Sequence, residues 1–169
     1  AATVRTTAGD VSPSEPNSDL TVAGQQDVSG VEVATQHNVL ATLGDTNGNV
    51  AENYDVTLSS NNSATSFGST ALTTNSSGQA STTVTLPETK GTVAINASAG
   101  DFNASGTSNA QVNVTTQAEP VSALQFGSDA AASIAPNSQD NSYTVEAVDQ
   151  YGNVNTSTNS GDVTLESSD

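Results

Sequence analysis

The sequence has no cysteine, tryptophan or methionine, and His37 is its single histidine among 169 residues. Without cysteine there is no disulfide framework and no thiolate for catalysis or metal binding. A single histidine also excludes histidine clusters and a cysteine–histidine pair in this segment, so we interpret His37 as an ordinary surface residue. Composition leaves a serine–histidine–aspartate set open, but no nucleophile elbow, phosphate loop or carboxylate pair is visible. The sequence therefore predicts no enzyme.

Basic residues are nearly absent. Arg5 and Lys90 stand against 18 acidic residues, which gives a formal net charge of -16 and a pI of about 4.1. Such a chain repels phosphate backbones and anionic lipid headgroups, so we expect no nucleic-acid binding and no direct membrane contact. A surface with many acids and almost no lysine suits a high-salt medium, where screening removes self-repulsion. Two interpretations stay open, a halophilic protein and an acidic secreted one.

Long apolar runs are missing too. No stretch approaches the roughly 20 apolar residues of a membrane-spanning helix, and no charged-then-apolar leader precedes Ala1. We expect any signal peptide or anchor to lie outside this segment. The 33% of hydrophobic residues alternate with Thr, Ser and Asn, which is the pattern of half-buried strands.

The sequence does contain an internal repeat. Asp45-Thr46-Asn47-Gly48-Asn49-Val50 returns 104 residues later as Asp149-Gln150-Tyr151-Gly152-Asn153-Val154. Other segments recur as well, namely Glu15-Pro16 as Glu119-Pro120, Leu20 as Leu124 and, after a longer loop, Asp55–Leu58 as Asp162–Leu165. About 100 residues is a usual domain size. The chain is therefore interpreted as a tandem array.

The repeat divides the chain into three parts. Residues 1–14 are the end strand of a preceding repeat, or an N-terminal extension, with a linker; residues 15–118 are a complete domain; and residues 119–169 are the first half of a second one. The second copy lacks a match for residues 62–116. A β-domain that lacks half of its strands exposes an apolar face and open strand edges. We expect either that the natural protein continues or that another chain supplies the missing strands.

The complete copy predicts seven or eight short strands separated by turns, without helical periodicity. Val28–Ala34 is expected to cross between sheets, and Ser69–Leu72 to form a short strand. Val56 and Leu58, repeated as Val163 and Leu165, are expected to form a further strand. The residues expected to face the core are Val39, Ala41, Leu43, Ala80, Thr82, Val84, Leu86, Val93, Ile95, Ala97, Ala110, Val112 and Val114, with Tyr143, Val145 and Ala147 in the second copy. This pattern predicts an all-β, immunoglobulin-like β-sandwich.

The order of these pieces resembles a known family. Asp45–Val50, Val56–Leu58, Asn75–Ala80, Thr83–Leu86 and Gly91–Val93 together are similar to the bacterial Ig-like domains of invasin- and intimin-type adhesins. Similar domains occur in surface-layer and other envelope proteins of halophilic archaea. Such domains are mostly spacers, so the resemblance implies a structural spacer, although one fold hosts many functions.

Two kinds of candidate site stand out. Asp45, Asn47, Asn49 and Asp55 carry the hard oxygen ligands that calcium prefers, so calcium is the one cofactor considered. Their spacing is not that of a calcium loop, and the alternative is a structural turn in which Asp binds following N–H groups and Gly is left-handed. Six Asn-x-Ser/Thr sequons are candidates for N-glycosylation, at Asn61, Asn75, Asn96, Asn103, Asn113 and Asn155.

These observations favour a structural repeat in an extracellular surface protein of a halophile, either a surface-layer glycoprotein or an adhesin stalk. Its partners would be neighbouring Ig-like domains, copies of itself and N-linked glycans. One alternative is a module that binds glycans or a host receptor, for which Tyr54 and Tyr151 are the candidates. Others are a virion fibre or spike and an enzyme's accessory domain.

Overall fold

The computed structural model describes residues 11–12, 18–45, 47–99, 111–128, 143–157, 163–164 and 166. The chain divides into unit 1, Ala1–Gln117, and unit 2, Ala118–Asp169. All elements of the described residues are β-strands. Within them, no helix is long and apolar enough to cross a membrane.

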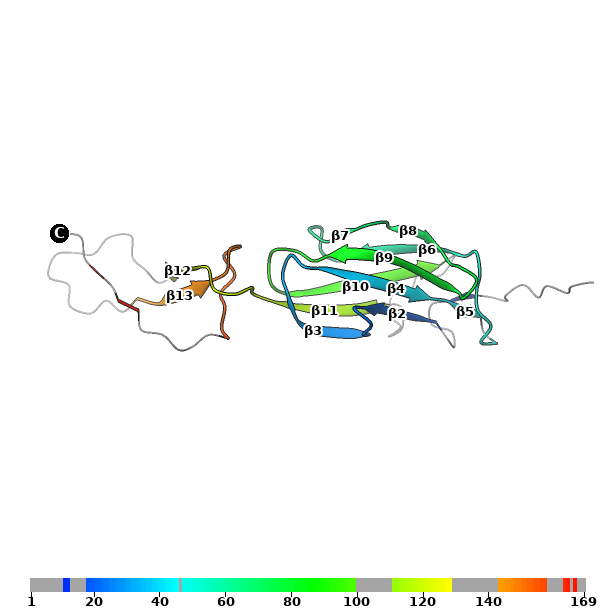
Figure 1. Ribbon diagram of the computed structural model, residues 1–169, viewed down its shortest axis with the longest axis horizontal. Coiled ribbons are helices and arrows are strands. Elements are labelled where there is room, and N and C mark those ends of the chain that lie inside the picture. Colours follow the sequence, from blue (N-terminus) through cyan, green and yellow to red (C-terminus); the bar gives the residue numbers. More distant parts are fainter. Residues whose placement is uncertain are drawn as a thin grey trace, which may run out of the picture. The chain divides into compact units, whose positions relative to one another are not determined.

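Unit 1 contains two main sheets (Figure 1). The five-stranded sheet has the order β3-β11-β10-β6-β8, formed by Asp27–Glu32, Gln111–Gln117, Thr92–Ala99, Asp55–Ser60 and Ala71–Thr73. The four-stranded sheet has the order β2-β4-β9-β7, formed by Asp19–Val22, Gln36–Thr42, Gln79–Thr85 and Ser66–Phe67. Neighbours are antiparallel except β3 and β11, which are parallel. The predicted all-β sandwich is confirmed.

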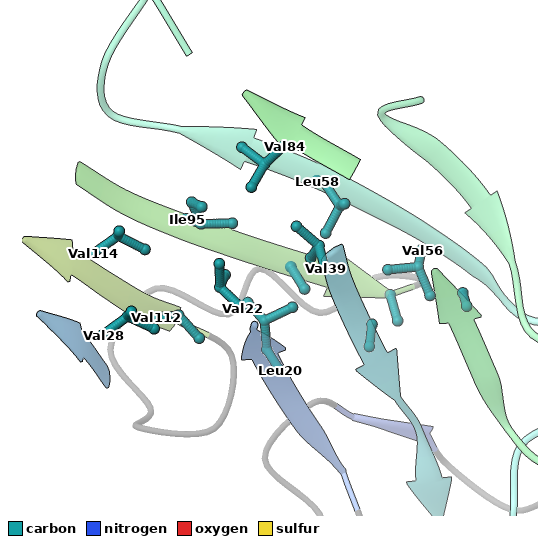
Figure 2. Packing of buried hydrophobic residues seen from close by; sticks show 14 of the residues in the cluster. Leu20, Val22, Val28, Val39, Val56, Leu58, Val84, Ile95, Val112 and Val114 are labelled. Carbon is teal, nitrogen blue, oxygen red and sulfur yellow. The ribbon is translucent and has the colours of Figure 1, made fainter. Parts of the chain in front are cut away.

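The core lies between these sheets because each strand alternates buried and solvent-facing residues. Figure 2 shows valine, leucine and isoleucine side chains from both sheets gathered in this space. Every described residue of unit 1 predicted to face the core is buried, except Thr82, which is half-buried. Fully burying such an aliphatic side chain contributes roughly 1.5–3 kcal/mol, so this layer is the main source of stability in unit 1.

The strand predicted for Val28–Ala34 is β3 (Asp27–Glu32), which lies in the five-stranded sheet only; the crossing between sheets takes place just before it, in the turn between β2 and β3. β2 pairs with β4 in the four-stranded sheet, placing Leu20 opposite Ala41, whereas β3 pairs with β11 in the five-stranded sheet. Between β2 and β3, Val22 and Gln25 exchange two backbone hydrogen bonds of 2.9 and 3.0 Å across a tight turn. The first part of the complete copy therefore contributes an edge strand to each sheet.

Some predicted boundaries are wrong. The segment 1–14, expected to end in a linker, contains β1 (Val11–Ser12), which pairs with β5 (Gly44–Asp45) of the complete domain. The strand expected at Ser69–Leu72 is β8, at Ala71–Thr73. β7 was not predicted, and its Phe67 packs against the core. Short edge strands are set by their neighbours, which a local pattern does not reveal.

His37 belongs to β4, where it is half-buried and its Nε2 lies 2.8 Å from Thr35 Oγ1.

Unit 2 has one described sheet, of β12 (Ala123–Phe126) and β13 (Val145–Val148). Leu124 pairs with Ala147, whereas the pairing of β2 with β4, moved by 104 residues, would place Leu124 opposite Val145. The register thus differs by two residues. Because side chains alternate with a period of two, this shift keeps the same residues on the same face.

The apolar face of this sheet is exposed. Leu124 and Phe126 are 56% and 58% exposed, and the Phe126 and Tyr143 rings meet edge to face with centroids 6.3 Å apart. Tyr143, Val145 and Ala147 are half-buried, so this predicted core face is only partly covered. Val163 and Thr164 do not form the expected strand, since their counterparts in β6 are held by β10 and β8. Residues 1–10, Asn103, Ala110 and Leu165 lie outside the described residues.

Candidate functional site

The repeated Asp-x-x-Gly-Asn-Val segment forms a turn that we call corner 1 (residues 45–50) and corner 2 (residues 149–154). In corner 1, Asp45 is 1% exposed, and its Oδ1 accepts hydrogen bonds from the N–H groups of Asn47 and Asn49, at 2.9 and 2.7 Å. Its Oδ2 accepts from Asn49 Nδ2 at 2.9 Å. Gly48, with φ of +79°, donates its N–H to the Asp45 carbonyl at 2.9 Å.

Corner 2 has the same hydrogen bonds at the positions 104 residues later. Asp149, 2% exposed, accepts at Oδ1 from the N–H groups of Tyr151 and Asn153, at 2.9 and 2.8 Å. Its Oδ2 accepts from Asn153 Nδ2 at 2.9 Å, and Gly152 has φ of +83°. The predicted structural turn is confirmed, with Asp bound to following N–H groups and a left-handed Gly. Corner 1 connects β4 to β6, which lies in the other sheet.

Corner 2 also holds the chain where it enters unit 2. The N–H of Glu119 donates to Asp149 Oδ2 at 3.0 Å, and the Glu119 carbonyl accepts from Asn155 Nδ2 at 2.8 Å. Gln150 Nε2 donates to Glu119 Oε2 at 2.6 Å. We did not predict this role of Glu119. The available signal was the constant spacing of 30 residues between Glu-Pro and the corner Asp in both copies.

The Asp149 carboxyl is stabilised in its charged form. Desolvation by burial acts to raise its pKa, but hydrogen bonds from the Asn153 side chain and from the N–H groups of Asn153, Glu119 and Tyr151 outweigh it. The result is a pKa below the usual value. Hydrogen bonds donated to a carboxylate favour its ionised form, so corner 2 is built around an anion neutralised by N–H dipoles.

The four calcium candidates are only partly brought together. Asp45 and Asn49 are in direct contact, and Asn47 contributes its backbone N–H. Asp55 instead lies on β6, where its Oδ1 accepts from Thr73 Oγ1 of β8 at 3.2 Å. Both oxygens of Asp45 accept hydrogen bonds, so a cation there would have to displace N–H donors. The described residues contain no group of three or more His, Cys, Asp or Glu arranged to hold a metal.

The sequons fall into strands and turns. Asn96 lies on β10 and Asn113 on β11, whereas Asn61 follows β6, Asn75 precedes β9 and Asn155 follows corner 2. The two tyrosines considered for a binding module differ in their surroundings. Tyr54 packs against the core, and Tyr151 is 38% exposed beside corner 2.

The two facing sheets, the parallel β3–β11 pair and the crossing between sheets from β2 to β3 define an immunoglobulin-like β-sandwich. No protein-family model matches the sequence, and no curated protein matches it. Solved structures do resemble it. The adhesin FdeC of Escherichia coli is 18% identical over 89% of this chain with a TM-score of 0.59, and invasin, a bacterial integrin-binding protein, is 17% identical over 84% with a TM-score of 0.57.

The match spans less than half of either relative, 46% of the FdeC structure and 28% of the invasin structure. The D00–D0 domains of intimin also match, over 66% of this chain and 50% of theirs, with 18% identity and a TM-score of 0.48. At these identities the likeness is one of fold. The chain has the Ig-like fold seen in the FdeC and invasin structures, and the sequence predicted such a fold.

Proposed function

We propose that this chain is a structural repeat of an extracellular surface protein, in which Ig-like domains serve as spacers of an adhesin stalk or of a surface lattice. The observation that carries the proposal is the fold shared with FdeC and invasin. The corners support it, because their buried carboxylates are occupied by the chain's own N–H groups. In this proposal residues 15–118 form a complete domain and residues 119–169 the opening half of another.

The location can be tested on intact cells that make the protein. We expect a protease added outside to cleave it, as followed with an antibody against residues 15–118, while a cytosolic marker stays intact. Cleavage seen only after lysis would contradict a surface role. Purified chain tested against glycan arrays and cell receptors is expected to bind none, and saturable binding lost on Tyr151→Ala would favour the binding module instead.

We also propose that the protein works at high salt. Its net charge of -16 opposes folding by self-repulsion, and the Debye length falls from about 10 Å at 0.1 M salt to about 3 Å at 1 M. The melting temperature should therefore rise between these concentrations of NaCl. Replacing the exposed Glu32 and Glu52 by Gln should reduce the rise, because both changes remove negative charge. An unchanged salt dependence in the double variant would contradict charge screening as the cause.

A further inference from the structure

The five sequons with described structure differ in what their side chains already bind. N-glycosylation joins an oligosaccharide to the Asn Nδ2, so the side chain must reach solvent and Nδ2 must give up a hydrogen. Modification removes one of the two Nδ2 hydrogens and leaves Oδ1 an acceptor. It therefore competes with a bond that Nδ2 donates, whereas bonds accepted by Oδ1 fix the plane of the amide and with it the direction of the glycan. The surroundings of each amide therefore rank the sites.

Asn155 is the least suited of these sites. Its Nδ2 donates to the Glu119 carbonyl at 2.8 Å, and its Oδ1 accepts from the Ser157 N–H at 2.9 Å, in a half-buried setting. The atom that would carry the sugar thus helps to hold the entry of unit 2. A glycan there would compete with this bond.

Asn61 and Asn75 also use their amides locally. Asn75 Oδ1 accepts from the N–H groups of Ser77 and Gln79, at 2.9 and 3.1 Å. Asn61 Oδ1 accepts from the Ala94 N–H at 2.8 Å. These bonds fix the plane of each amide against the backbone of a turn or a neighbouring strand.

Asn113 has the opposite surroundings. It is exposed on β11 between the buried Val112 and Val114, so its side chain lies on the outer face of the five-stranded sheet. Its cross-strand partners are Ala94 on β10 and Asp27 on β3. The small Ala94 side chain leaves space beside it, and the Asn113 side chain interacts with Gln111, whose Nε2 donates to Oδ1 at 3.0 Å at the surface.

Asn96 lies on the same outer face but is more crowded. It is half-buried on β10, with Gln111 on one side and Ser59 on the other. Asn113 is its diagonal neighbour on β11, two residues beyond Gln111, a separation of roughly 7–8 Å in a sheet. The outer face of this sheet therefore carries two sequons, of which Asn113 is the more accessible, whereas Asn61 and Asn75 are also exposed but have Oδ1 bound to backbone N–H groups.

From this ranking we infer that Asn113 is the principal N-glycosylation site among the described sequons of unit 1, and that Asn155 stays unmodified. In the reaction, Nδ2 bonds to the anomeric carbon of an oligosaccharide carried on a lipid phosphate. The bond from that carbon to the phosphate oxygen breaks, the lipid phosphate leaves with the electron pair, and Nδ2 loses one proton. The inference rests on the proposed function, since such donors serve exported proteins.

The test is glycopeptide mass spectrometry of the protein purified from its own cells. Because Pro120 blocks cleavage after Glu119, cleavage after Asp and Glu gives a peptide of residues 102–129, which contains Asn103 and Asn113, and one of residues 150–162, which contains Asn155. Electron-transfer fragmentation then locates the added mass. We expect the glycan on Asn113 and none on Asn155. An unmodified Asn113, or a modified Asn155, would overturn the inference.

Thr115 offers a matched pair of variants. It is the third residue of the Asn113 sequon, is exposed on β11, and its Oγ1 lies 3.2 Å from Thr92 Oγ1. Thr115→Ser keeps the sequon and should keep the glycan, whereas Thr115→Ala should lose it with Asn113 still present. Glycan retained in Thr115→Ala would show that the sequon does not direct the modification.

Surface exposure is scored separately, by protease treatment of intact cells. Protein that is cleaved from outside but carries no sugar on Asn113 would refute the glycan assignment and leave the surface role standing. Protein with a modified Asn113 that only becomes cleavable after lysis would support the glycan assignment and refute the surface role.

Discussion

Leu20 and Leu124 occupy corresponding positions in the two copies of the repeat, but their surroundings differ. Leu20 on β2 is 2% exposed, whereas Leu124 on β12 is 56% exposed. Leu20 belongs to a core cluster with residues of β6, β10 and β11. No strand in the described part of unit 2 takes that place. Burial of the same residue type therefore depends on strands that lie far away in sequence.

The corners do not show this difference between the units, because their hydrogen bonds are the same in both. Every hydrogen bond to the Asp45 side chain described above comes from a residue at most four positions away, and Asp149 receives the same set together with the Glu119 N–H. The bonds common to the two corners come from within four residues. The comparison shows that these shared polar bonds are local, while the apolar faces need the whole sandwich.

The largest contrast should come from truncating the two leucines. Leu20→Ala removes a buried side chain and should destabilise unit 1 by about 2–5 kcal/mol. Leu124→Ala should change unit 2 by about 0.5 kcal/mol or less, as is usual at exposed positions. Amide hydrogen exchange of β4 and β13 reports on each unit separately. Equal losses would mean that the face of unit 2 is covered in solution.

Two glycines sharpen the comparison further. A Cβ on Gly78, where φ is +71°, would lie 2.6 Å from the Leu43 carbonyl oxygen, so Gly78→Ala should cost about 2–4 kcal/mol. Gly152 in corner 2 has φ of +83° but nothing within 4 Å of such a Cβ. Gly152→Ala should then cost only the strain of placing a non-glycine residue in the left-handed conformation, about 1–2 kcal/mol. Chemical denaturation followed by circular dichroism would rank the two, and the reverse order would contradict the packing at Gly78.

The corner aspartates should give smaller and similar effects. Asp45→Ala and Asp149→Ala each leave buried N–H donors unsatisfied, which costs about 1–3 kcal/mol. Asp149→Ala should also speed hydrogen exchange of the Glu119 N–H, which bonds to the carboxylate. Glu119→Gln is the control, since it keeps that N–H. Unchanged exchange in Asp149→Ala would refute the anchoring of Glu119 by corner 2.

The smallest effect should appear at low pH. Because the pKa of Asp149 is lower in the folded chain than its usual 3.8, its ionised form stabilises unit 2 above that pH. The contribution is lost as the pH falls through the lowered folded pKa. The stability difference between the natural chain and Asp149→Asn should therefore shrink below pH 3.8. A difference that stays constant down to pH 2 would contradict the role of the charge.

The sequence predicted what depends on alternation and on local turn chemistry. The buried phase at Val39 and Ile95 follows from a period of two, and the corners follow from Asp and Gly at fixed positions. β7 was missed because a strand of two residues is too short to show an alternating pattern. The register of β12 was missed because a shift of two residues leaves the pattern unchanged. The anchoring of Glu119 joins residues 30 positions apart, beyond any local signal.

The parallel pairing of β3 with β11 has a mechanical consequence. The chain enters this pair through β3 and leaves unit 1 through β11, with Asp27 opposite Asn113 and Glu32 opposite Gln117. In parallel strands the entering end of one and the leaving end of the other lie at opposite ends of the ladder. A pull from both sides that has passed β1 and β2 thus slides β3 lengthwise along β11. The ladder bears this tension as shear across all its hydrogen bonds at once, rather than opening one bond after another.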